Sequence, residues 1–347
     1  MYYMDTWYLN NLVCPREHLK LNQTGDALIC PRDHRYPVVD GIPVMLLDDV
    51  RQTMGIIDAS LKRARGEIVS DERAPYFYLE SLGISEKEKD GIIELSLQNK
   101  SNIDPVVTYL IGATNGIMYK HLIGKLDSYP IPDLCLPEGN GQALLDIGCS
   151  WGRWCIAAQR KGYVVVGIDP SLGAIMAARR VSQQLGLSIK YLVADARYLP
   201  FDNNSFNNIF SYSVLQHLDR DNVRMVLSEI ARILKPQGTS LIQMPNIFGL
   251  RCLYHQAKRN FRKAVEFEVR YRSLSSLRKL FSESIGKTEI SVDCYFGLGL
   301  QKSDARFMSL TRNFILTASE LLKKISKFIP FIIHIADSVY LRSTCEK

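Results

Sequence analysis

The chain of 347 residues contains no uncharged apolar run of about 20 residues, the length that a membrane-spanning helix needs, so a transmembrane protein is not expected. Its first residues lack the basic head and apolar middle of a secretory signal peptide. Eight cysteines in a chain of this length do not indicate a disulfide framework. Apolar residues make up 46% of the chain, too many for a disordered protein. Together these features predict a cytoplasmic globular protein with one large domain and room for a small one.

Positive charge is scarce in most of the chain and concentrated near its end. Residues 1–250 carry 25 Lys and Arg against 27 Asp and Glu, whereas residues 251–347 carry 18 against 9. The last quarter therefore supplies the whole net charge of +7. Such a region suits a phosphate-bearing substrate, RNA or an anionic membrane surface, and a solvated basic face without a partner is equally compatible with it.

The pattern of apolar residues divides the chain into three parts. Residues 1–48 are short apolar runs punctuated by Cys, His, Gly and Pro, which we interpret as a small module. Residues 49–141 combine a helical segment with a Pro-rich linker. From residue 142 to 347, short apolar runs alternate with amphipathic segments, a pattern that predicts a doubly wound α/β domain with a mostly parallel sheet. The predicted strands are Ala143–Ile147, Val164–Ile168, Ile189–Ala194, Asn208–Ser213 and Thr239–Met244, and the predicted helices are Arg153–Arg160, Leu172–Leu185 and Asn222–Leu234.

Glycine and aspartate residues gather where the first three of these strands end. Gly148 and Gly152 follow the first strand, Asp169 follows the second, and Asp195 follows the third. In a sheet of this kind, ligands bind at the carboxyl ends of the strands, and an acid after the second strand suits the hydroxyls of a ribose. The G-x-G-x-x-G pattern of dinucleotide-binding proteins is missing, so the sequence predicts a nucleoside ligand without phosphates.

These motifs resemble those of the class I S-adenosylmethionine-dependent methyltransferases, most closely the small-molecule branch that includes ubiquinone-biosynthesis enzymes. The resemblance covers about residues 142–245 and implies a seven-stranded Rossmann-like sheet and S-adenosyl-L-methionine as cofactor. The motifs that carry it are Asp146-x-Gly148-x-Ser150-x-Gly152, Asp169, Asp195-Ala196, Phe206 and Ser213-Val214-Leu215-Gln216-His217.

The resemblance also implies a role for each residue of the cofactor site, which includes Asp146. Gly148, Ser150 and Gly152 would line the methionine part of the cofactor. Asp169 would hold the ribose hydroxyls. In the same way, Asp195 and Ala196 would flank the adenine.

Methyl transfer from a sulfonium needs little more than alignment, because the methyl group is already activated and orientation alone contributes about 7–11 kcal/mol. A base is required only where the acceptor must lose a proton. His217 is the best-placed candidate, since imidazole titrates near neutrality, and a packing or helix-capping histidine is the alternative. Tyr254 and His255 follow the fifth strand and form a second pair that could face the substrate; the alternative is a helix surface. The loops hold no further carboxylate pair that would suggest metal-dependent transfer.

Two Cys-x-x-x-His motifs stand near the amino terminus, Cys14 with His18 and Cys30 with His34. Four such ligands would complete a tetrahedral zinc site, and zinc would stabilise a module with little core of its own. The segment 36–46 that follows resembles the end of the zinc ribbon found in methyltransferase activators and before rRNA guanine methyltransferases. A metal-free ribbon in which these side chains simply pack is the alternative.

Towards the carboxyl terminus, Thr288–Cys294 and Ser338–Ser343 predict an antiparallel pair of strands that closes the sheet. Between them, at about residues 300–337, lies an inserted helical region, in which Phe314–Ile329 has apolar residues at helical spacing and lysines on its other face. It could form a lid over the substrate, or contact a membrane that presents a lipid-linked substrate. We favour a helix packed against the sheet edge, because His334 and Asp337 interrupt the apolar run that follows.

Three functions compete at this point. The first is methylation of an O, N or C atom of a small-molecule, glycan or lipid-linked acceptor. The second is RNA methylation, which would use the ribbon and the basic last quarter, and the third is a non-catalytic binding partner that keeps the fold. The loop Ser213–His217 lacks the Asn/Asp-Pro-Pro-Tyr motif of enzymes that methylate adenine or cytosine amino groups, and the intact acids argue against the third function. The sequence therefore favours the first, with the acceptor and the oligomeric state left open.

Overall fold

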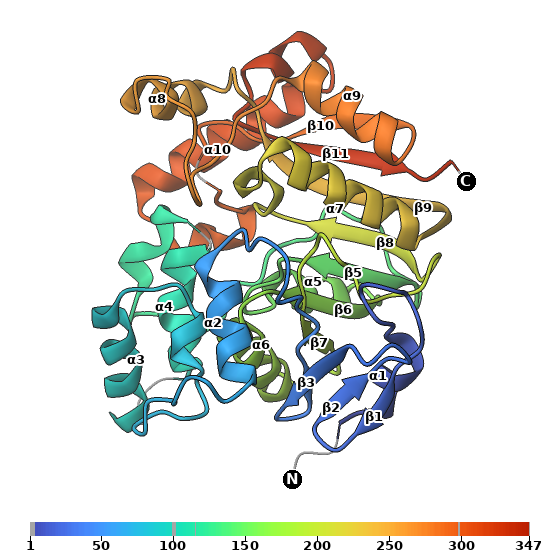
Figure 1. Ribbon diagram of the computed structural model, residues 1–347. Coiled ribbons are helices and arrows are strands. Elements are labelled where there is room, and N and C mark those ends of the chain that lie inside the picture. Colours follow the sequence, from blue (N-terminus) through green and yellow to red (C-terminus); the bar gives the residue numbers. More distant parts are fainter. Residues whose placement is uncertain (1–3, 99–101, 115, 298, 347) are drawn as a thin grey trace.

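Seven strands lie side by side in one sheet of the computed structural model, which describes residues 4–98, 102–114, 116–297 and 299–346 (Figure 1). The strand order is β10-β11-β9-β8-β5-β6-β7, and only β11 runs antiparallel to its neighbours. The predicted doubly wound, mostly parallel fold is therefore confirmed. The strands are β5 (Ala143–Ile147), β6 (Val164–Asp169), β7 (Lys190–Val193), β8 (Phe206–Ser211), β9 (Leu234–Pro245), β10 (Thr288–Cys294) and β11 (Ser338–Thr344).

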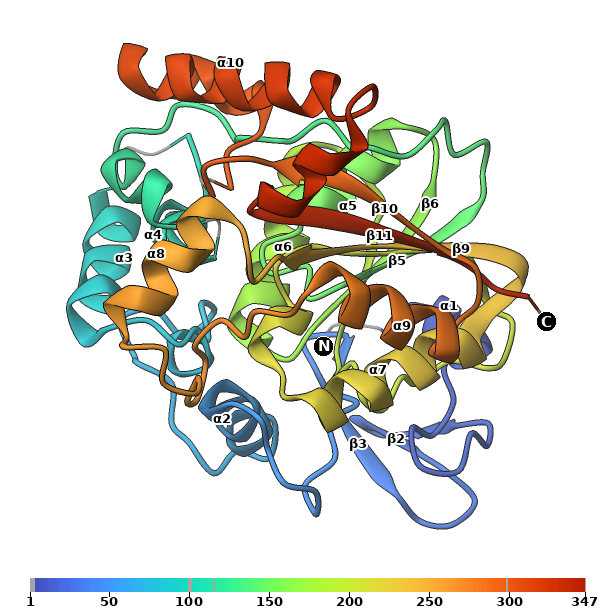
Figure 2. The ribbon, with the colours of Figure 1, turned by 90° about the horizontal axis from the view of Figure 1, so that it is seen from above.

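Both faces of this sheet are covered. Leu144 and Leu145 are adjacent in β5 and are both buried, but they belong to two different apolar clusters on opposite faces of the sheet. Helices α5 and α6 lie on the face of Leu144, and α7 and α9 lie on the face of Leu145 (Figure 2). The helices of this part are α5 (Arg153–Arg160), α6 (Leu172–Gln184), α7 (Arg220–Ile233), α8 (Leu250–Lys258), α9 (Leu274–Ser284) and α10 (Leu310–Ile325).

The first strands of the chain form a separate four-stranded antiparallel sheet, in the order β1-β2-β3-β4. It is joined to the edge of the large sheet: Val44 makes a parallel bridge with Val193 of β7, and the Tyr8 hydroxyl donates a hydrogen bond to the carbonyl of Tyr191 at 2.7 Å. The two sheets share one apolar cluster. The elements are α1 (Thr6–Asn11), β1 (Asn22–Thr24), β2 (Ala27–Ile29), β3 (Arg35–Val39) and β4 (Ile42–Pro43).

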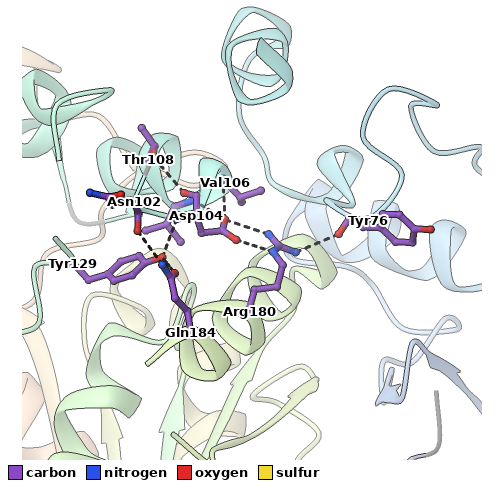
Figure 3. A network of polar contacts seen from close by, with 9 residues as sticks. Tyr76, Asn102, Asp104, Val106, Thr108, Tyr129, Arg180 and Gln184 are labelled. Atoms are coloured by element: carbon purple, nitrogen blue, oxygen red, sulfur yellow. Dashed lines mark hydrogen bonds and ion pairs between the residues drawn. The ribbon is translucent and has the colours of Figure 1, made fainter. Parts of the chain in front are cut away.

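A helical segment connects the two sheets and is held to α6 by a partly buried ion pair (Figure 3). The Asp104 carboxylate accepts hydrogen bonds from Arg180 Nε at 2.6 Å and from Arg180 Nη2 at 3.2 Å. The Tyr129 hydroxyl accepts from the Asp104 N–H at 2.8 Å and donates to Gln184 at 2.6 Å. These contacts fix the segment beside the parallel sheet. Its helices are α2 (Gly55–Ala64), the 3-10 turn η1 (Leu79–Ser81), α3 (Glu86–Gln98), α4 (Pro105–Thr114) and the 3-10 helix η2 (Ile117–Leu122).

The predicted closing strands are confirmed as β10 and β11, and the chain between them forms the 3-10 helix η4 (Lys302–Phe307), α10 and the 3-10 helix η5 (Pro330–Ile335). Helix α10 packs against the edge strand β10, as predicted, and its Ser319 hydroxyl accepts the N–H of Tyr295 at 3.0 Å, but only part of its apolar surface is buried. Leu316 is buried, but Leu310, Phe314 and Leu321 remain 90%, 75% and 57% exposed. The apolar residues are spread around more of the helix than one protein contact covers.

Within the described ranges, no helix is both long and apolar enough to cross a bilayer.

Candidate functional site

The loop between β5 and α5 contains three residues with left-handed backbone conformations. Their φ angles are 73° at Gly148, 48° at Ser150 and 82° at Gly152, which caps the amino end of α5. A side chain on Gly148 would run into Val214, in the loop after β8. The loop therefore brings the ends of β5 and β8 together with little side-chain bulk between them.

Asp169, at the end of β6, is the polar anchor of this loop. Its Oδ2 accepts the N–H of Ser150 at 3.0 Å, and its Oδ1 accepts the N–H of Ser171 at 2.9 Å. Burial raises the pKa of this carboxyl to about 6. A carboxylate oxygen offers two acceptor sites, so Asp169 retains capacity for further donors.

The second predicted acid of the loop, Asp146, is turned towards the protein interior. Its Oδ2 accepts a hydrogen bond from the Cys155 thiol at 3.1 Å, and burial raises its pKa to about 7. This hydrogen bond links β5 to α5, the helix that follows the glycine loop.

Asp195 and Ala196 lie at the end of β7. Asp195 is buried and forms an ion pair with Arg197 at 2.7 Å, while its Oδ1 accepts the Arg197 N–H at 2.9 Å. Arg197 also donates to Asn222 at the start of α7, at 3.1 Å. If adenine binds to Asp195 as predicted, it would therefore share this carboxylate with the guanidinium of Arg197.

His217 ends the 3-10 turn η3 (Leu215–His217), directly after the loop that touches Gly148. Its ring stacks on Phe267 with centroids 3.8 Å apart, and its Nδ1 lies 2.7 Å from the Phe267 carbonyl oxygen. A carbonyl only accepts, so the contact assigns the proton to Nδ1 and leaves Nε2 as the acceptor, 3.2 Å from the Gln216 amide nitrogen. Burial lowers the pKa of His217 to about 4, so its imidazole is neutral at physiological pH.

Tyr254 and His255 lie on α8. Tyr254 is 61% exposed, and the two rings meet edge to face at 5.5 Å. Their place on this outer helix agrees with the alternative of a helix surface, and a contact with substrate stays a prediction.

The amino-terminal motifs meet only in part. Cys14, Cys30 and His34 come together, with His34 Nδ1 at 3.5 Å from the Cys14 sulfur and 3.4 Å from the Cys30 sulfur. Among the residues described, His18 is not a member of this group. The Tyr36 hydroxyl lies 3.1 Å from the Cys14 sulfur. Three of the four predicted zinc ligands are therefore positioned to act together.

Sequence reasoning missed a buried ionic cluster beside the glycine loop. Arg153, the first residue of α5, is 7% exposed, and its Nη2 lies 3.4 Å from Oδ1 of Asp304, which is completely buried. Tyr119 of η2 donates a hydrogen bond to Asp304 and accepts one from Arg153 at 3.4 Å. The cluster joins η2 and η4 to the amino end of α5. The one signal in the sequence was a charged residue placed directly after Gly152.

Three polar side-chain atoms at the loop have no partner among the described residues. They are the Ser150 hydroxyl, Trp151 Nε1 and Arg153 Nε, and all three are buried. Buried polar atoms are nearly always hydrogen-bonded, so unpaired atoms at one loop mark a place where a polar ligand would bind.

Comparison with known proteins shows what this part of the chain is similar to. Residues 144–238 match the family described as "Methyltransferase domain". The chain is 34% identical over 106 residues to the ubiquinone biosynthesis O-methyltransferase of Bartonella bacilliformis, a match that covers 30% of this chain and 42% of that one. It is 35% identical over 106 residues to phosphoethanolamine N-methyltransferase 2 of Caenorhabditis elegans, over 30% of this chain and 24% of that one. The match thus spans less than half the length of these relatives.

Among solved structures, phosphoethanolamine N-methyltransferase 2 of Haemonchus contortus in complex with S-adenosyl-L-methionine superposes with a TM-score of 0.44 and 21% identity. The superposition covers 61% of this chain and 50% of that one. The family match bears out the predicted resemblance to methyltransferases over residues 144–238, and the predicted domain limits of 142 and 347 stay a prediction. The roles of the individual site residues stay predictions.

Proposed function

We propose, from the class I methyltransferase domain that residues 144–238 form, that this protein transfers a methyl group from S-adenosyl-L-methionine to an O, N or C atom of a small-molecule, glycan or lipid-linked acceptor. The observation that carries the proposal is the position of Asp169, which bridges the glycine loop and the end of β6 through the N–H groups of Ser150 and Ser171. The relatives are named for ubiquinone biosynthesis and for phosphoethanolamine, which favours this reading over RNA methylation.

The residues present fit this cofactor. The left-handed glycines let the loop pack closely against Val214 and Tyr191, and the unpaired Ser150 hydroxyl would supply a polar contact for the methionine part. Asp169 would accept from the two ribose hydroxyls, and Ala196 with Asp195 would border the adenine.

The bound sulfonium supplies a methyl group that needs no further activation. The protein has to hold the acceptor in line and exclude water, for which the carboxyl edge of β5, β6 and β8 provides the platform. His217 is neutral with Nε2 free of a proton, so it can accept one from a hydroxyl or ammonium acceptor. Its low pKa makes it a weak base, suited to removing a proton as the methyl transfers rather than before.

His217→Ala should lower turnover by roughly 10²-fold or more, the range that one general base contributes. Cofactor affinity should change little, because the residue is proposed to serve the acceptor. Steady-state kinetics with an accepted substrate, beside calorimetric titration with S-adenosylhomocysteine, would separate the two effects. Full activity in this variant would remove His217 as the base. His334→Ala, at the exposed end of η5, is the matched control.

We also propose that Cys14, Cys30 and His34 hold a zinc ion, since two thiolates and an imidazole are a ligand set that zinc prefers. Elemental analysis of the purified full chain should find about one zinc per molecule, the amount expected if these three side chains hold one ion. Cys30→Ser should remove most of it.

His18→Ala is the matched comparison for this site. It should leave the zinc content unchanged, because His18 is outside the three-residue group. A loss of zinc in this variant would instead restore His18 as the fourth ligand, and zinc-free wild-type protein purified without chelators would contradict the site altogether.

A further inference from the structure

Helix α10 presents an apolar stripe to solvent. Leu310, Phe314 and Leu321 are 90%, 75% and 57% exposed, and they recur at intervals that place them on one face of a helix. Beyond the end of the helix, Phe328 is 87% exposed and Phe331 is 79% exposed. Scattered single apolar residues are normal on a protein surface, but a row of this length is a mark of an interaction site.

A second helix extends this surface. Leu250, Leu253 and Tyr254 of α8 are all exposed, and α8 and α10 border one groove of about 580 Å³. Tyr254 lines it from α8, and Phe314 lines it from α10. Figure 1 shows the two helices on the same side of the molecule. Leu250, Tyr254 and Phe314 thus share one groove, and we call this groove, together with the exposed apolar residues of α8 and α10, the apolar face.

Positive charge is abundant in the segments that carry the apolar face. Residues 248–263 and 309–336 together contain nine Lys and Arg and a single acid, Glu320. Directly beside the groove, a second depression of about 830 Å³ is lined by Lys258, Arg259 and Arg262, although Arg262 also pairs with Glu268. The apolar groove and the cationic depression therefore meet at α8, where Tyr254 lines the first and Lys258 lines the second.

From this combination we propose that α8, α10 and the residues after α10 dock onto a lipid bilayer that contains anionic phospholipid. Exposed Phe and Leu side chains beside Lys and Arg match the two layers of such a surface, with the apolar groups at the acyl chains and the cations at the phosphates. A second copy of this chain fits less well, because it would bring the same cations towards one another. RNA would engage the cations but leave Leu310 and Leu321 in water. The inference does not depend on methyl transfer.

Sedimentation of the full chain with lipid vesicles tests this proposal. Binding to vesicles of phosphatidylcholine and phosphatidylglycerol in equal parts should be roughly tenfold or more tighter than binding to phosphatidylcholine alone, and it should weaken as salt rises. If the chain stays in the supernatant with both kinds of vesicle at low salt, the proposal is wrong.

A matched pair of triple variants locates the surface. Leu310→Ser, Phe314→Ser and Leu321→Ser together should reduce vesicle binding at least tenfold. The control combines Val69→Ser, Tyr76→Ser and Leu97→Ser, side chains that are also mostly exposed but lie far along the chain, and it should bind like the wild type. Since all six side chains are exposed, both proteins should fold, and unchanged affinity for S-adenosylhomocysteine would verify this where the cofactor binds.

Two results would overturn the assignment of this face. One is equal vesicle binding by both triple variants. The other is light scattering that shows a wild-type dimer and a monomer for the α10 variant, because the face would then be covered by a second copy of the chain.

Discussion

Asp169→Ala should weaken the binding of S-adenosylhomocysteine by roughly 100-fold or more, because a hydrogen bond to a charged group contributes about 1.5–3 kcal/mol and two hydroxyls are proposed to donate to this carboxylate. The variant also loses the acceptors of the Ser150 and Ser171 N–H groups, so the glycine loop itself becomes less ordered. Isothermal titration calorimetry measures the affinity directly, and circular dichroism checks that the fold is retained.

The pH dependence of cofactor affinity is an independent test of the role of Asp169. Burial raises the pKa of Asp169 to about 6, so its carboxyl gains a proton as the pH falls through that value and then loses acceptor capacity. Wild-type affinity should therefore drop between neutral pH and about pH 5, and the affinity of Asp169→Asn should be low and nearly constant over this range. Asp133→Asn, at an exposed position, should behave like the wild type. Wild-type affinity in Asp169→Ala would show that the ligand is held elsewhere.

The second large effect concerns the folded state. Asp304→Ala should lower the free energy of unfolding by roughly 3–5 kcal/mol, because it leaves the Arg153 guanidinium buried without its counter-ion. Urea denaturation followed by fluorescence would report the change.

A double variant distinguishes the charge from the packing at this position. Arg153→Met combined with Asp304→Leu removes both charges and should recover most of the lost stability, since apolar pairs of similar size often replace buried ion pairs without cost. Asp221→Ala, at an exposed position in α7, is the control and should change stability by less than about 0.5 kcal/mol. If Asp304→Ala lowered the free energy of unfolding no more than Asp221→Ala, the cluster would not contribute to stability.

The central domain could be predicted closely from the sequence because its signals are local. Ala143–Ile147 and Arg153–Arg160 were predicted with the boundaries that the structure has, since a continuous apolar run and a helical period meet at a glycine loop. The start of β9 was placed five residues late, at Thr239 in place of Leu234. The segment between these residues is polar, contains a proline and a glycine, and pairs with β8 through a register shift.

What escaped prediction depends on contacts between distant parts of the chain. Arg153 and Asp304 are 151 residues apart, and no local pattern pairs them. The repeated Cys-x-x-x-His motif suggested four equivalent ligands, but the backbone at His18 turns into a left-handed conformation and only His34 reaches the two sulfurs. For α10, the period gave the apolar residues correctly. The helical spacing could not show which of these side chains pack against the protein and which are exposed.

The amino-terminal sheet has a consequence for experiments with shortened chains. Val44 and Met45 bind the backbone of Val193, so part of the outer rim of β7 is already paired. Cutting the chain before β5 would uncover that rim, and unpaired strand edges invite aggregation and domain swapping. A fragment that begins at β5 is therefore expected to aggregate or to form domain-swapped species in solution.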